Sequence, residues 1–161
     1  MLKLVDRVLF WALSGLLALA MLVIAVLVFM QVIWRYFLQQ PLTWSEEVIR
    51  YSLIWGVFFG AALLSRERGH VVVDFLVDRL PQGPRRVVRI TVSLAVVGLL
   101  AMLSKGGWEF VLSNRGMTTP AIGMPMAFVY SSVPVGLTLM AVYFFRELVI
   151  FLRGERGRLR G

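Results

Sequence analysis

The chain contains no cysteine and only one histidine, His70, among its 161 residues. Without cysteine it forms no disulfide, and it can hold neither a thiolate-ligated zinc ion nor an iron–sulfur cluster. A single histidine also excludes a haem held by two histidine side chains of this chain alone. We therefore expect no cofactor and no metal site.

Charged residues are scarce as well. They make up 16% of the chain, whereas hydrophobic residues make up 59% and the mean hydropathy is +0.80. A soluble domain is nearer half apolar and a quarter charged, so this composition predicts an integral membrane protein. The net charge of +8 does not indicate nucleic-acid binding, because the basic residues cluster in a few short polar segments. Charges placed in this way set the orientation of membrane helices.

The longest apolar run, from Val8 to Trp34, contains no charged residue. As a helix it would be about 40 Å long, enough to span the hydrocarbon core with a tilt. Ala18-Leu19-Ala20 resembles a signal-peptide cleavage site. The apolar run continues well beyond the usual apolar core of a signal peptide, so we expect a retained membrane helix.

Three further apolar runs complete an all-α prediction of four transmembrane helices in one membrane domain, residues 1–161. The expected spans cover residues 8–34, 46–65, 87–104 and 126–145. Lys105 and the Gly106-Gly107 pair are expected to weaken the helix at the end of the third span. Pro134 lies inside the fourth span, where it removes a backbone hydrogen bond and should kink the helix.

The segment between the second and third spans is polar. In residues 70–80, Asp74 and Asp78 are four residues apart on one helical face, and apolar residues occupy the other. This pattern predicts a short amphipathic helix in the membrane interface. The two carboxylates are better interpreted as a solvated face than as a metal site. His70 could relay protons, but a structural role is favoured because no partner is evident.

Arginine and lysine counts predict the topology. Two basic residues lie at the N-terminus, six between residues 66 and 89, and five in the C-terminal tail. Only four lie in the connections 35–50 and 105–115. Both termini are therefore expected on the cytoplasmic side.

The segment from Pro41 to His70 concentrates charge at both ends of an apolar helix. Thr43 and Glu46 have the spacing of a capping box. Glu46, Glu47 and Arg50 are spaced so that they can share one helical face. They can act as caps and depth markers, as an inter-subunit ion-pair patch, or as an ion-coupling site. The last is disfavoured, because no charged residue lies near the centre of any apolar run.

Several motifs recur in a specific order along nearly the whole chain. R-Y-x4-P-L-x-W-S-E-E runs from Arg35 to Glu47, and R-E-x-G-H-V-x-V-D from Arg66 to Asp74. Later come P-A-I-G-M-P-M, from Pro120 to Met126, and Pro134-Val135-Gly136. This series resembles the small membrane subunit of tripartite ATP-independent periplasmic (TRAP) transporters.

The resemblance implies a non-catalytic four-helix scaffold that assembles with a large multi-pass membrane subunit. In such systems the large subunit carries the substrate and sodium sites, and an extracytoplasmic solute-binding protein delivers an organic acid. Neither a catalytic nor a substrate-binding residue is then expected on this chain. The expected location is the cytoplasmic (inner) membrane of a bacterium or archaeon, in contact with membrane lipid.

The resemblance also implies places for the candidate interface residues. Those expected to shape the outward end are Arg35, Trp44, Glu46, Glu47 and Arg50. Those expected at the cytoplasmic corner are Arg66, His70 and Asp74. Further candidates for partner contacts or structure are Trp55, Gly60, Pro120, Pro125 and Pro134.

Two other functional classes stay open at this point. A membrane anchor of a respiratory enzyme would usually need histidine haem ligands or a quinone pocket. A small self-contained homo-oligomeric transporter should carry a carboxylate embedded in the membrane, which the apolar runs lack.

Overall fold

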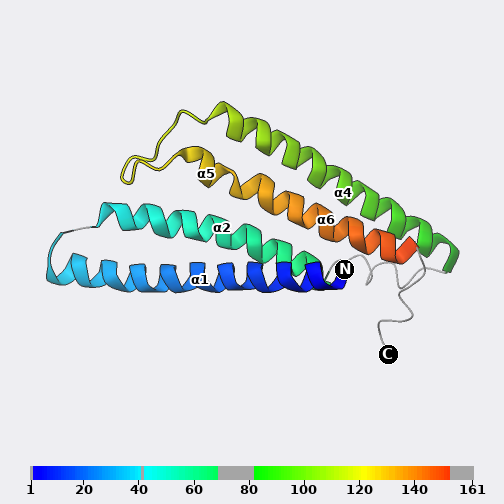
Figure 1. Ribbon diagram of the computed structural model, residues 1–161, viewed down its shortest axis with the longest axis horizontal. Helices are drawn as coiled ribbons and strands as arrows, with labels where there is room; N and C mark the ends of the chain where they lie inside the picture. The colour runs from blue at the N-terminus through cyan, green and yellow to red at the C-terminus, as the bar shows by residue number, and fades with distance from the viewer. Residues whose placement is uncertain (1, 41, 69–81, 153–161) are drawn as a thin grey trace.

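The computed structural model describes residues 2–40, 42–68 and 82–152, which form an all-helical structure (Figure 1). Four stretches are long and apolar enough to cross a membrane. This confirms the prediction of four membrane-spanning segments. The expected interfacial helix, with His70 and Asp74, lies outside the described residues. The helices are α1 (Leu2–Phe37), α2 (Thr43–Arg68), α4 (Gln82–Ser113), α5 (Met126–Tyr130) and α6 (Ser132–Leu152).

The first two helices extend beyond the predicted spans at both ends. A helix satisfies its own backbone hydrogen bonds, so an apolar run in lipid stays helical until water or side chains can replace those bonds. With 36 residues, α1 is about 54 Å long, well above the thickness of the hydrocarbon core. The extra turns carry the polar residues that the hydropathy pattern excluded from the spans.

The helix of the third span does not weaken after Ser104 as expected, because α4 continues to Ser113. Lys105 and Glu109 lie one turn apart on the exposed surface, with Nζ and Oε1 3.9 Å apart. Gly107 does not break the helix. It lets α4 approach Pro134 of the neighbouring helix α6, since a Cβ added at Gly107 would lie 3.2 Å from the Pro134 Cβ. Glycine in a membrane helix thus marks a packing contact here and not a terminus.

The fourth span is interrupted at Ser131, between α5 and α6. Pro134 has no N–H to donate to the carbonyl four residues earlier, so the helical hydrogen-bond ladder is broken at this point. The hydroxyls of Ser131 and Ser132 instead donate to the carbonyls of Phe128 and Val129, each at 2.7 Å. The disturbance predicted at Pro134 is therefore present one turn before it.

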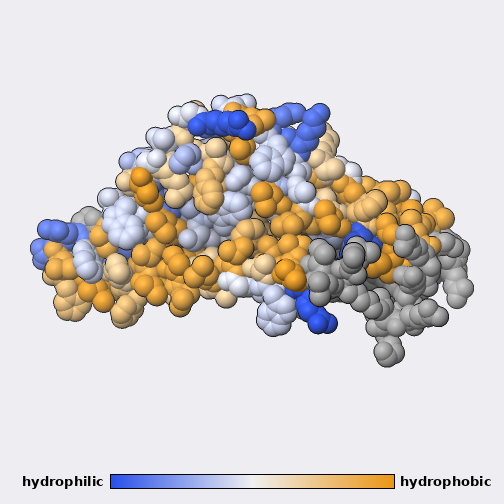
Figure 2. All heavy atoms as spheres, viewed as in Figure 1, coloured by the Kyte–Doolittle hydropathy of each residue, from blue (hydrophilic) through white to orange (hydrophobic). Residues whose placement is uncertain are grey.

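The helices form a single layer in the order α1, α2, α6, α4 (Figure 1). Each of α2 and α6 packs against two long neighbours, whereas α1 and α4 lie at the edges. Only 6% of the most apolar part of α1 is buried inside the chain. Figure 2 shows apolar side chains gathered along the α1 edge. The exposed apolar side chains of α1 include Val8, Trp11, Leu19, Leu22 and Phe29.

Small residues set the distances between neighbouring helices. Gly136 of α6 faces Phe58 of α2, and a Cβ added at Gly136 would lie 2.6 Å from the Phe58 Cβ. Gly56 of α2 similarly faces Met21 of α1, and Gly60 lies opposite Leu17 of the same helix. The G-x-x-x-G pattern of α2 thus serves a helix contact within this chain.

Candidate functional sites at the two ends of the helix layer

Two sets of polar residues lie at opposite ends of the helix layer. One end holds the α1–α2 connection and the loop between α4 and α5, residues 114–125; we call it the Glu47 end. At the other end, Asp6 of α1 meets Arg66 of α2 and Arg146 of α6; we call it the Asp6 end. The start of α1 and the end of α6 therefore lie together (Figure 1).

The loop at the Glu47 end is a compact hairpin. The Met126 N–H donates to the Met117 carbonyl and the Thr119 N–H to the Met124 carbonyl, both at 2.8 Å. The Thr119 hydroxyl in turn accepts the Met124 N–H at 3.0 Å. Gly123 adopts φ +70°, a turn conformation that favours glycine. These bonds fix the conformation of the loop.

Glu47 fastens this hairpin to the first turns of α2. Its carboxylate accepts the backbone N–H groups of Ala121 at 3.1 Å and Ile122 at 3.3 Å. The residue is only 8% exposed. A largely buried carboxylate that accepts two backbone N–H bonds makes strong, charge-assisted contacts. Glu47 therefore couples the start of α2 to the loop 74 residues later in the chain.

Glu47→Gln is expected to loosen this loop. The amide keeps one acceptor oxygen but points an NH₂ group at a second N–H, so one charge-assisted bond is lost and the other weakened. We expect faster hydrogen exchange at the backbone amides of Ala121 and Ile122, by about tenfold or more. Glu46→Gln is the matched control, and equal exchange in both variants would contradict the assignment.

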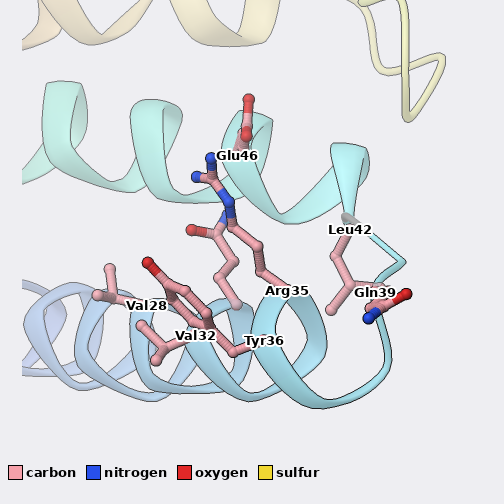
Figure 3. Close-up of a pocket in the computed structure, with 8 residues that line it drawn as sticks. Val28, Val32, Arg35, Tyr36, Gln39, Leu42 and Glu46 are labelled. Atoms are coloured by element: carbon pink, nitrogen blue, oxygen red, sulfur yellow. The ribbon is translucent and has the colours of Figure 1, made fainter.

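Glu46 has different neighbours from Glu47, because adjacent residues of a helix point about 100° apart. It lines a groove of about 530 Å³ between the end of α1 and the start of α2. Figure 3 shows Arg35 extending from α1 toward the first turn of α2, beside Glu46. The structure thus brings together two predicted site residues, Arg35 and Glu46. The other lining residues are Val28, Gln31, Val32, Tyr36, Gln39 and Leu42.

The predicted capping box is replaced by a different contact. Thr43 is the first residue of α2 and not its cap. The side chain that closes the first turn is Ser45, whose hydroxyl donates to the Leu42 carbonyl at 2.7 Å. Gln31 of α1 donates to the same hydroxyl at 2.8 Å, which joins the two helices. Sequence spacing does not reveal this pair, because the contact spans two helices.

The remaining predicted residues at this end have separate surroundings. Trp44 and Arg50 are exposed on α2, and Pro120 is exposed on the loop. Pro125, also exposed, directly precedes α5. Trp55 packs between Phe59 and Phe128, with ring centroids 5.1 and 5.4 Å away. It therefore holds α5 against α2.

The Asp6 end carries a three-helix ionic cluster. Arg66 donates from Nη2 to Asp6 Oδ2 at 2.9 Å and from Nε to Oδ1 at 3.2 Å, which is a bidentate pair. Arg146 of α6 donates to the same carboxylate. The Arg66 guanidinium also lies over the ring of Phe10, 4.3 Å from its centroid. One carboxylate therefore ties α1, α2 and α6 together.

Arg66 was a predicted site residue, whereas Asp6 and Arg146 were not singled out. The available signal was a lone acidic residue at the start of an apolar helix. Such a residue needs a cation from another helix if it is not in water. Its partners lie 60 and 140 residues away, so only the folded chain pairs them.

The polar contacts of the described residues hold helices and the loop together. Among residues 2–40, 42–68 and 82–152 no group of three or more potential ligands is placed to hold a metal ion. Inside the helix layer, the hydroxyls of Ser104 and Thr138 lie 2.7 Å apart and form a hydrogen bond. The charged contacts of Asp6 hold three helix ends together, and those of Glu47 hold the 114–125 loop against α2.

Comparison with known proteins agrees with the resemblance. Residues 24–154 match the family model described as the DctQ component of tripartite ATP-independent periplasmic transporters. The chain is 33% identical over 118 residues to the C4-dicarboxylate TRAP transporter small permease protein DctQ of Rhodobacter capsulatus, covering 70% of this chain and 50% of that one. It is 30% identical over 130 residues to the ectoine TRAP transporter small permease protein TeaB of Halomonas elongata, covering 80% and 67%.

A third relative is much longer. The isethionate TRAP transporter permease protein DctMQ of Oleidesulfovibrio alaskensis is 26% identical over 136 residues. The match covers 80% of this chain but only 21% of that protein. The region similar to this chain is therefore, in that relative, one part of a larger polypeptide.

Proposed function

We propose that this chain, which belongs to the DctQ-component family of tripartite ATP-independent periplasmic (TRAP) transporters, is the scaffold subunit of an ion-coupled organic-acid transporter. It assembles with a large multi-pass transport subunit in the bacterial inner membrane and has no catalytic role. A solute-binding protein outside the cytoplasm delivers the substrate to this complex.

The observation that carries this proposal is the one-layer arrangement of the helices. A membrane protein that encloses its own substrate path needs helices around that path, whereas here α1 and α4 are open edges. Both edges present large apolar side chains, on α4 notably Leu99, Met102 and Phe110. Such a layer is suited to widening the membrane-embedded surface of a partner.

The fused relative supports a large partner. In the isethionate permease protein DctMQ, the part similar to this chain is joined to a segment several times longer. A fused pair in one organism is expected to correspond to two interacting chains in another. The small subunit would then contact the large one along an apolar edge of the layer.

The substrate is set by the partners. The named relatives carry ectoine, C4-dicarboxylate and isethionate in their names, yet they match this chain to a similar degree, 26–33%. Different substrates at similar sequence identity are expected when the substrate site lies on another subunit. We assign this transporter to organic acids as a class, with no single compound.

From the positive-inside rule we expect the Asp6 end in the cytoplasm and the Glu47 end outside. The hairpin that Glu47 fastens would then face the solute-binding protein. Its exposed residues include Pro120 and Ile122. A rigid loop loses little entropy on docking, which favours a defined contact.

A pull-down tests the assembly. The tagged full chain is purified from native membranes in mild detergent, and its partners are identified and quantified by mass spectrometry. We expect a large polytopic membrane protein in a one-to-one ratio. Recovery of this chain alone as a stable homo-oligomer would overturn the scaffold proposal in favour of a self-contained transporter. A haem absorbance spectrum in the purified complex would favour a respiratory anchor.

A further inference from the structure

We propose that the groove between α1 and α2 at the Glu47 end binds the headgroup of a zwitterionic phospholipid, phosphatidylethanolamine. Arg35 would take the phosphate and Glu46 the ammonium group. This inference assigns a ligand to two residues of this chain, and it does not depend on which large subunit is the partner.

The groove holds one charge of each sign. Arg35 and Glu46 both line it, and both side chains are exposed. In the part of the chain that the structure describes, neither makes an ion pair or hydrogen bond with the other or with a third residue. A ligand that carries phosphate and ammonium together satisfies both charges at once.

The groove lies where a headgroup lies in a membrane. It begins in the last turns of the α1 span, which ends at Phe37, and reaches the first turn of α2. Tyr36 and Gln39 add polar groups on the α1 side (Figure 3). The phosphate is thus provided with the Arg35 cation and with neutral polar groups.

The walls of the groove continue into the apolar edge of α1. Val28 and Val32 line it one turn apart, and both are about half exposed. Further along the same edge lie Leu22 and other exposed apolar side chains. An acyl chain attached to the bound headgroup can therefore lie along α1 and cover its apolar side chains. A soluble phosphate ester has no acyl chain and would leave this surface uncovered. For this reason we assign a lipid and not a free phosphate ester.

Native mass spectrometry of the purified full chain tests this site. The protein is equilibrated with phosphatidylethanolamine, phosphatidylcholine and phosphatidylglycerol of identical acyl chains. Wild-type protein is expected to retain phosphatidylethanolamine about tenfold over phosphatidylcholine, whose quaternary amine cannot donate to Glu46. Equal retention of these two lipids overturns the assignment without any variant.

Two variants separate the two charges. Arg35→Gln is expected to lower retention of phosphatidylethanolamine and phosphatidylglycerol about tenfold, since both carry the phosphate. Glu46→Gln is expected to lower phosphatidylethanolamine only. Arg115→Gln and Glu109→Gln, exposed charges outside the groove, are the matched controls. Unchanged retention in Arg35→Gln, or equal loss of both lipids in Glu46→Gln, overturns the site.

A competition arm identifies the source of the headgroup. Soluble phosphoethanolamine in excess is expected to leave the bound phosphatidylethanolamine in place, because it lacks the acyl chains that cover α1. Complete displacement would assign the groove to a soluble phosphate ester and overturn the lipid proposal. Helical content by circular dichroism is compared across variants, so that a folding defect is recognised as such.

Discussion

Gly136→Ala is expected to force α2 and α6 apart and to lower the free energy of unfolding by about 3 kcal/mol. The added Cβ would lie 2.6 Å from the Phe58 Cβ and 2.8 Å from Cδ1 of the same ring. A Cβ is fixed to the backbone and cannot rotate away, so relief requires one helix to move. Since α2 and α6 are the two inner helices of the layer, that movement would disturb both halves of the fold.

The thermal unfolding midpoint of the purified chain in detergent measures this effect. A loss of that size corresponds to a fall of roughly 6–12 °C for a chain of this length. Gly98→Ala is the matched control, because an added Cβ there meets nothing within 4 Å. Phe58→Ala should not rescue Gly136→Ala, since it keeps the Cβ that makes the closest contact. Equal midpoints for the two glycine variants would refute the close crossing.

Asp6→Asn is the second variant expected to have a large effect. It leaves the Arg66 and Arg146 guanidinium groups together without the carboxylate that both contact. Their side chains are 26% and 38% exposed, so water screens part of the repulsion. Removing one partner of a fully buried pair costs about 3–5 kcal/mol, and an exposed pair contributes less than about 1. We expect a loss of about 2 kcal/mol, together with weaker attachment of α1.

Unfolding midpoints and hydrogen exchange in the first turns of α1 report this loss. Glu109→Gln is the matched control, since it breaks the well-exposed Lys105–Glu109 pair and should change the midpoint little. Adding Arg146→Gln to Asp6→Asn removes one surplus cation and should recover part of the stability. If the double variant is destabilised by the full sum of the two single changes, the three groups do not form one cluster.

The two ends of the layer have different mechanical roles. At the Asp6 end, one carboxylate joins three helices, so the helix ends are held in register. At the Glu47 end, a carboxylate joins a helix to a loop, so a surface is held in shape. Both arrangements fit the scaffold role that we propose.

The number of spans and their order followed from the sequence alone. In lipid every backbone polar group must be satisfied within the segment, so a long uncharged run becomes a helix almost regardless of its neighbours. The helix end expected at Lys105 and Gly106-Gly107 was wrong, because α4 continues to Ser113. Hydropathy detects Lys105 and Gly106-Gly107 as polar or flexible, whereas a helix surface can carry them at its exposed end.

The tertiary structure alone decided which side chains meet. The sequence placed Glu46 and Glu47 side by side, but neighbouring residues on a helix point about 100° apart, so one faces the hairpin and the other the α1 groove. Asp6 stood out only as a lone acidic residue at the start of an apolar helix, and its contact with Arg146 depends on the order of helices in the layer. Periodicity and hydropathy are local properties of the chain. Contacts between helices are set by small residues such as Gly136 and by buried charges, which act only once the chain has folded.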